Sequence, residues 1–222
     1  MIACIPSKVA RKTNLNDEYL RVIAFWAMLL DHHAYLNLEP NINYFILRII
    51  GRLAAPIFFY LLVKGWKRSR NVKKYFFRLV FWGFISQAVL FFLNIEHAVN
   101  ILLSMAVALV MLESCQKLGW YWIIFYCICA EILNLESGFY GILMCFIFGF
   151  LKGRILGLSL VLVNIFAVVI GYFSVIQLFS LLSLLLIKSE FKNRLIDGFI
   201  IKIPKIFWYL IYPLQWILIY II

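Results

Sequence analysis

Apolar runs long enough to cross a bilayer recur along almost the whole of this 222-residue chain. A transmembrane helix needs about 20 predominantly apolar residues, and nine such windows can be drawn between Tyr19 and Ile222. Hydrophobic residues make up 65% of the sequence and charged residues 14%, against roughly 45–50% and 25% in an ordinary soluble domain. The sequence therefore predicts an all-α, polytopic transmembrane helix bundle and excludes a soluble globule.

Polar or turn-forming residues separate the nine predicted spans, which are residues 19–36, 44–66, 75–93, 98–112, 120–135, 139–151, 155–170, 172–187 and 206–222. Glycines between residues 138 and 171 allow tilted or broken segments, so eight or ten helices remain open. Residues 1–18 are predicted as a cytoplasmic tail and residues 19–222 as one transmembrane bundle. The apolar run behind the basic tail is too long for the core of a signal peptide, so we expect the first helix to be the insertion signal.

The positions of the basic residues explain most of the net charge of +11 by the predicted topology. With the N-terminus inside, 18 of the 21 lysines and arginines fall in inner segments and none in outer loops, while Arg48, Arg52 and Lys64 lie in the second helix. Basic residues near short loops stay on the cytoplasmic side. We therefore expect a bacterial cytoplasmic membrane protein with its N-terminus inside and its C-terminus outside, whose charge faces anionic lipid rather than nucleic acid.

Sequence signatures of several common site types are missing. Neither a P-loop nor a G-x-G-x-x-G run before a soluble helix is present, so the sequence does not favour an ATPase or a Rossmann enzyme. The five cysteines are scattered without the C-x-x-C spacing of zinc or redox sites, and they are interpreted as packing residues. No metal site is expected.

Ionisable residues gather in the outer half of the first two helices. Asp31, His32 and His33 lie on the first helix, and Arg48 and Arg52 lie one turn apart on the second. A charge near the middle of a span costs about 2.5–3.5 kcal/mol, so these residues are expected to be paired or functional. Either an ion pair staples the two helices, or Asp31 orients an imidazole that acts as a general base while an arginine stabilises an oxyanion. Adjacent histidines point about 100° apart, so only one of them can face the same cavity.

Further polar residues are predicted at the same depth, where they would line the entrance for an acceptor: Glu96, His97 and Asn100 before the fourth span, Glu131, Asn134 and Glu136 after the fifth, and Tyr212 and Gln215 in the last. For each of them, simple solvation at the membrane edge is the alternative. The tyrosines of the last span are equally explained as part of an aromatic belt.

A basic cluster follows the second span, and its candidate binding residues are Lys64, Arg68, Arg70, Lys73, Lys74 and Arg78. It holds more positive charge than orientation alone requires. Lipid headgroups are one candidate ligand, and the phosphates of a nucleotide-containing donor are the other.

The chain resembles the TraX family of bacterial integral membrane proteins. The resemblance lies in residues 19–36 (YLRVIAFWAMLLDHHAYL), residues 47–71 (LRIIGRLAAPIFFYLLVKGWKRSRN), the helix start KKYFFRL, the S-G-x-Y-G turn at 137–141 and FWYLIYP near the end. The resemblance implies that this protein acetylates the amino terminus of a conjugative pilin subunit. It also implies similarity to transmembrane acyltransferases that take an acyl group from cytosolic acyl-coenzyme A.

The resemblance implies that Asp31 and His32 are the catalytic pair, that Arg52 is the arginine of a G-R element, and that Lys64, Arg68 and Arg70 lie on the donor side. The terminal Y-P-x-H element of the family has Gln215 in place of the histidine, and a glutamine can hydrogen-bond but cannot act as a base.

The sequence thus favours a membrane-embedded acyltransferase that moves an acetyl group from acetyl-CoA to an exported acceptor. The acceptor could be a pilin-like peptide, a glycan or a lipid. Two alternatives remain open at this point. One is a small transporter or flippase gated by the intramembrane charges, and the other is a non-catalytic subunit of a conjugation or secretion complex.

Overall fold

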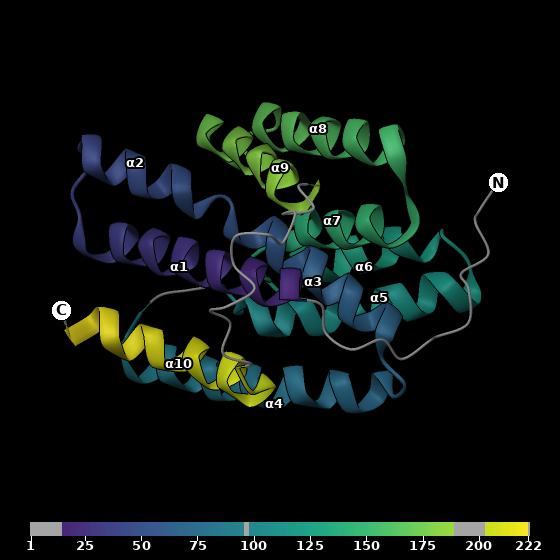
Figure 1. Ribbon diagram of the computed structural model, residues 1–222, viewed down its shortest axis with the longest axis horizontal. Helices are drawn as coiled ribbons and strands as arrows, with labels where there is room; N and C mark the ends of the chain where they lie inside the picture. Colours follow the sequence, from purple (N-terminus) through teal and green to yellow (C-terminus); the bar gives the residue numbers. More distant parts are fainter. Residues whose placement is uncertain (1–14, 96–97, 189–202, 222) are drawn as a thin grey trace.

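The computed structural model describes residues 15–95, 98–188 and 203–221, and in this part of the chain every regular element is a helix (Figure 1). The helices are α1 (Leu15–Asn37), α2 (Ile42–Gly51), α3 (Ala54–Arg68), α4 (Val72–Phe92), α5 (Ile101–Leu118), α6 (Trp122–Ile132), α7 (Gly138–Phe150), α8 (Gly153–Val169), the 3₁₀ helix η1 (Val175–Leu182), α9 (Ser183–Lys188) and α10 (Lys205–Ile221). The predicted all-α fold is confirmed.

Three stretches of the described chain are long and apolar enough to cross a membrane: Ile42–Arg68, Val72–Phe92 and Ile101–Leu118. Shorter apolar helices accompany them. Together with the apolar composition, these helices indicate a membrane protein.

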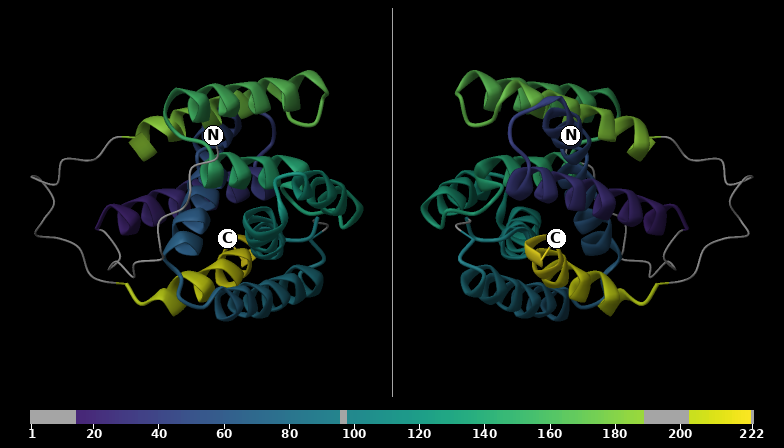
Figure 2. Two further views of the ribbon diagram at one scale, coloured as in Figure 1. Left: turned by 90° about the vertical axis from the view of Figure 1, so that its right-hand side faces the viewer. Right: turned by 90° about the vertical axis from the view of Figure 1, so that its left-hand side faces the viewer.

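The helices form three layers (Figure 2). α8 and α9 make one outer layer, α4 and α10 make the opposite one, and α1, α3, α5, α6 and α7 lie between them. α5 is central because it packs against α3, α4, α6 and α7. Its residues Leu109, Met111 and Leu112 are fully buried, so the main core lies around this helix.

The predicted second span, residues 44–66, is broken in the structure into α2 and α3, with Arg52 and Leu53 in the turn between them. Pro56 explains the break, because a proline has no N–H for the carbonyl of the residue four positions earlier, here Arg52, and its ring collides with that carbonyl. The predicted span at 172–187 likewise differs, since it forms η1 followed by the short α9. The other seven spans each contain one α-helix, and the bounds agree within four residues except for α5, which continues six residues past the predicted end at residue 112.

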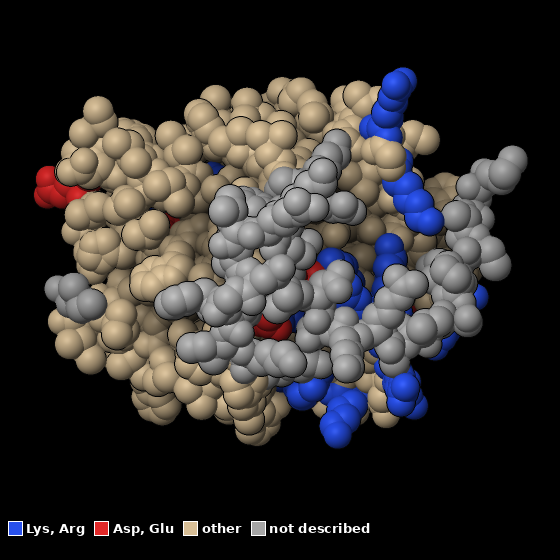
Figure 3. Space-filling model, viewed as in Figure 1, with Lys and Arg blue, Asp and Glu red and all other residues tan. Residues whose placement is uncertain are grey.

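Positive side chains gather at one end of the molecule, which we call the basic end (Figure 3). α3 and α5 end there and α4 and α8 begin there, which brings together Lys67, Arg68, Lys74, Lys117 and Lys152. α10 ends at the opposite end (Figure 1). The gathering of positive side chains at one end agrees with the prediction that the basic loops lie on one side of the membrane. The orientation of the protein in a membrane stays a prediction.

Candidate functional site

An ion-pair cluster joins α1 to α2 at Asp31. The Asp31 carboxylate accepts hydrogen bonds from Nη1 of Arg48 at 2.9 Å and from Nη2 of Arg52, 2.7 Å from each oxygen. Their side chains are only 14–21% exposed, so water screens these charges weakly. The predicted pairing of Asp31 with the arginines of the second span is therefore present.

Gly51 allows this close approach. A Cβ atom at Gly51 would lie 2.3 Å from Cβ and from Oδ1 of Asp31. Any larger residue at this position would push α1 away from α2. The turn after Gly51 then directs Arg52 back over α2, where its Nε donates to the Arg48 carbonyl at 3.4 Å.

A cavity of about 210 Å³ opens beside the cluster, and we call it the charged cavity. Its polar lining comes from α1, α2, α7, η1 and the segments next to them: Asp31, His32, Tyr35, Arg48, Arg52, Glu136, Ser137, Tyr140 and Gln177. Predicted site residues from the first two spans thus meet Glu136, another predicted lining residue, in one space.

The two adjacent histidines point to different places. His32 is buried, lines the charged cavity and stacks on Trp216 of α10, with 4.1 Å between ring centroids and 22° between planes. His33 instead lies near Asn37, whose Nδ2 is 3.2 Å from its Nδ1. The geometry therefore makes His32 the candidate base and leaves His33 outside the lining of this cavity.

A buried polar network continues from Arg52 into α7, α8 and η1. Nη1 of Arg52 donates to Oε1 of Gln177 at 3.4 Å, and Nε2 of Gln177 donates to the Tyr140 hydroxyl at 3.0 Å. The Tyr140 and Ser180 hydroxyls both donate to Oδ1 of Asn164, at 3.1 and 2.7 Å. Apart from Arg52, none of these residues was predicted from the sequence, because single polar residues in apolar helices give no signal of which ones meet.

Asn100, predicted to line the acceptor entrance, is instead the N-cap of α5. Its Oδ1 accepts from the backbone N–H groups of Leu102 and Leu103, and its Nδ2 donates to the Gly83 carbonyl at 2.8 Å and to Gln87 at 2.9 Å. Its side-chain oxygen caps α5, and its side-chain nitrogen holds α4 to α5. Asn100 is therefore a structural residue.

The remaining predicted lining residues have different positions. Asn134 lies in the turn after α6, where its backbone carbonyl accepts from the N–H of Val99 at 2.8 Å. Gln215 is buried beside α1, where its Nε2 lies 3.7 Å from Sδ of Met28, and Tyr212 lines a second cavity described below. Glu131 holds the start of α7 by accepting from the backbone N–H of Phe139 at 2.7 Å. Glu96 and His97 lie outside the described residues.

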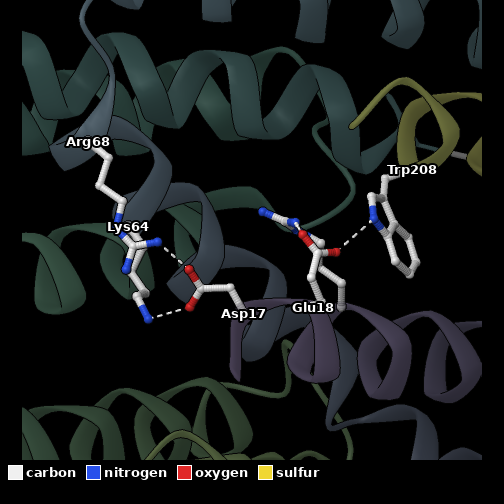
Figure 4. Close-up of polar contacts among 6 residues, drawn as sticks. Asp17, Glu18, Lys64, Arg68 and Trp208 are labelled. Carbon is white, nitrogen blue, oxygen red and sulfur yellow. Dashed lines mark hydrogen bonds and ion pairs between the residues drawn. The ribbon is translucent and has the colours of Figure 1, made fainter. Parts of the chain in front are cut away.

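Lys64 and Arg68, predicted to bind the donor, both donate to the buried carboxylate of Asp17 (Figure 4). Burial of Asp17 works to raise its pKa, but the hydrogen bonds from the two cations outweigh burial and lower the pKa below its usual value. The neighbouring Glu18 accepts from Arg21 and from Nε1 of Trp208 at 3.3 Å. The first turn of α1 therefore ties α3 and α10 together at the basic end.

The other basic residues of this region have different surroundings. Arg70, Lys73 and Lys74 are exposed. Arg78 is also exposed, and its guanidinium lies over the rings of Tyr75 and Tyr209, at 5.6 and 5.7 Å from their centroids. Arg78 is thus held by two aromatic rings.

A second cavity, of about 180 Å³, lies among α1, α3, α4, α5 and α10, and we call it the apolar cavity. Arg21, Gly65, Tyr75 and Tyr209 line it on the side of the basic end, and the remaining lining is apolar apart from Tyr212 and Trp208. Three side chains, Met28, Phe58 and Ile101, line both cavities. We call these three residues the neck, because the two cavities adjoin there.

In the described ranges, no three His, Cys, Asp or Glu side chains are grouped so as to hold a metal ion. The groups that converge on the charged cavity are one imidazole, two guanidinium groups and two carboxylates. Such a set can move a proton and stabilise a developing negative charge.

This chain is similar to a fimbrial assembly protein over part of its length and to a protein family over most of it. The probable fimbrial assembly protein FimC, serogroup H1, of Dichelobacter nodosus is 42% identical over 80 residues, which cover 36% of this chain and 33% of that protein. The match thus spans about a third of the relative's length. No solved structure matches. The sequence profile of the TraX protein family matches residues 16–222, from the start of α1 to the last residue, and the chain therefore belongs to the TraX family.

Proposed function

We propose that this protein is a membrane-embedded acyltransferase that moves an acetyl group from acetyl-CoA to an acceptor amine or hydroxyl. The observation that carries the proposal is the charged cavity, in which a buried His32 shares one space with Asp31, Arg48 and Arg52. Burying two guanidinium groups and a histidine costs free energy, and acid–base chemistry gives a reason for keeping them there.

In the proposed reaction, the His32 imidazole takes a proton from the acceptor while the acceptor's nitrogen or oxygen attacks the thioester carbonyl carbon. The new C–N or C–O bond forms, and the carbonyl oxygen becomes an oxyanion. When the oxyanion collapses, the C–S bond breaks, and the leaving thiolate receives the proton from the imidazolium. Acceptor and thioester are thereby converted to acetylated acceptor and free thiol, with no other reactant.

The arginines supply the charge for the oxyanion. A guanidinium has five N–H donors, and Arg48 and Arg52 use only some of theirs on Asp31. Asp31 holds both guanidinium groups at the cavity, and Oε1 of Gln177 accepts a hydrogen bond from Nη1 of Arg52. The proposed role of Asp31 is therefore to position the arginines.

The proposed setting is the bacterial cytoplasmic membrane, with the basic end in the cytosol, where acetyl-CoA is available. The proposed acceptor arrives from the outer side. Because the FimC relative is named a fimbrial assembly protein, a pilin-like peptide with a free amino terminus is the first acceptor to test, ahead of a glycan or a lipid.

Adjacent histidines provide the test. The purified protein in lipid nanodiscs receives acetyl-CoA and a peptide with a free amino terminus, and both acetyl-peptide and free thiol are measured. We expect His32→Ala to abolish transfer and His33→Ala, the matched control, to retain it. Equal activity of the wild type and His32→Ala would remove His32 as the base, and absence of thiol release by the wild type with peptide, glycan and lipid acceptors would refute the proposed activity.

A further inference from the structure

The cations at the basic end divide into two sets by what already holds them. Lys64 and Arg68 share the carboxylate of Asp17, which is 1% exposed (Figure 4). Its two oxygens accept from these side chains in the way that phosphate oxygens would. A phosphate could reach the pair only by displacing Asp17, which would leave a buried carboxylate without its partners.

Arg78 offers a different surface. It is exposed and has no acidic partner among the described residues, and its guanidinium stacks on Tyr75 and Tyr209. Stacking restricts the guanidinium plane while its N–H groups remain available at the edge of that plane. An arginine held in this way suits bidentate recognition of a phosphate.

The two rings also connect Arg78 to the apolar cavity, because both Tyr75 and Tyr209 line it. On α1, the cavity lining runs from Arg21 to Met28, seven residues or about 10 Å of helix. Met28 is a residue of the neck, and further along α1 Asp31 and His32 line the charged cavity. The linings of the two adjoining cavities thus extend from a cation at the basic end, along an apolar wall, to the candidate base.

We infer that Arg78, held by Tyr75 and Tyr209, binds a phosphate of the acyl donor, and that the apolar cavity receives the donor's flexible thioester arm. The ligand class is a phosphorylated thioester with a long, uncharged arm. This inference rests on the proposed function, and it moves the donor's phosphate away from the Lys64–Arg68 pair. The proposed occupant is the donor and not a phospholipid, because the cavity that adjoins the apolar cavity is lined by the buried His32.

The experiment measures coenzyme A and acetyl-CoA affinity by thermal shift of the full-length protein in phosphatidylcholine nanodiscs. Arg78→Gln should weaken binding by about tenfold or more, the usual loss for a hydrogen bond to a charged group. Arg154→Gln, at an exposed arginine that begins α8 at the same end, should stay within about twofold. Arg68→Gln should lower the melting temperature of the ligand-free protein without a comparable loss of affinity.

Each contrary outcome has a distinct meaning. Wild-type affinity in Arg78→Gln, an equal loss in Arg154→Gln, or a larger loss in Arg68→Gln would overturn the inference while leaving the acyltransferase intact. Stabilisation of the wild type by phosphatidylglycerol nanodiscs, abolished by Arg78→Gln and not opposed by coenzyme A, would assign the site to lipid. Absence of any coenzyme A binding by the wild type would refute the proposed function itself, and the inference with it.

Discussion

Replacing Gly51 by alanine tests the contact on which the charged cavity depends. The added Cβ would lie 2.3 Å from Cβ of Asp31, an atom one bond from the α1 backbone that cannot rotate away. Ordinary contact begins at 3.4 Å, so α1 and α2 must separate by about 1 Å. The Arg48–Asp31 bond, now 2.9 Å, would lengthen to about 4 Å if it followed that shift, beyond hydrogen-bond range.

The expected cost follows from packing. Overpacking a well-packed contact costs about 1–3 kcal/mol, and the better helix propensity of alanine returns up to about 1 kcal/mol. A net loss of about 1–2 kcal/mol corresponds to about 2–8 °C in melting temperature for a chain of this size. Acyl transfer should fall more steeply than stability, because the guanidinium groups lose their positions at the cavity.

Thermal unfolding in detergent, followed by tryptophan fluorescence, measures this shift. Gly149→Ala is the matched control, since its Cβ would meet only a terminal methyl of Leu112, at 2.8 Å, which can move by rotation. We expect the control to change the melting temperature by less than half as much. If Gly51→Ala melts and reacts like the wild type, the close approach of α1 and α2 at Asp31 does not exist.

Three further predictions concern buried polar and aromatic residues. The pKa of Asp17 is lowered in the folded state, so the contribution of its ion pairs to stability is complete above about pH 4 and is lost as the pH falls further. Melting curves recorded across this pH range should show the loss in the wild type and not in Asp17→Asn. Asn100→Ala should cost about 1–2 kcal/mol of stability through the lost cap and leave transfer per folded molecule unchanged, whereas loss of transfer at full stability would return Asn100 to the site. Trp216→Ala should cost about 3–5 kcal/mol of stability and lower transfer per folded molecule, because His32 loses the ring on which it stacks, and Trp216→Phe should restore both. Unchanged transfer per folded Trp216→Ala molecule would mean that the stacking does not position His32.

Much of the fold was predictable because apolar periodicity and turn-forming residues are local signals. The pairing of Asp31 with Arg48 and Arg52 was also predictable, since few charges occur in the first two spans and opposite charges there must meet. The break at Arg52 had a visible signal in Pro56, which a count of apolar residues along the span ignores.

The rest depended on contacts between distant segments. Asp17 falls in the predicted cytoplasmic tail, yet it lies in α1 and pairs with Lys64 and Arg68, which are 47 and 51 residues away. No local pattern shows that these cations already have a partner. Tyr140 and Gln177 come from different helices, and only the folded chain shows that their hydrogen bonds lead to Arg52.

The neck has a consequence for the membrane itself. Met28, Phe58 and Ile101 are apolar side chains that line both the charged cavity and the apolar cavity. Narrow apolar constrictions expel water, and a broken water file carries no protons. Each proton that crosses a membrane releases about 2.3 kcal/mol per 100 mV of potential. In the proposed membrane setting, this apolar lining would hinder the leakage of protons while leaving the apolar cavity open to the donor's arm.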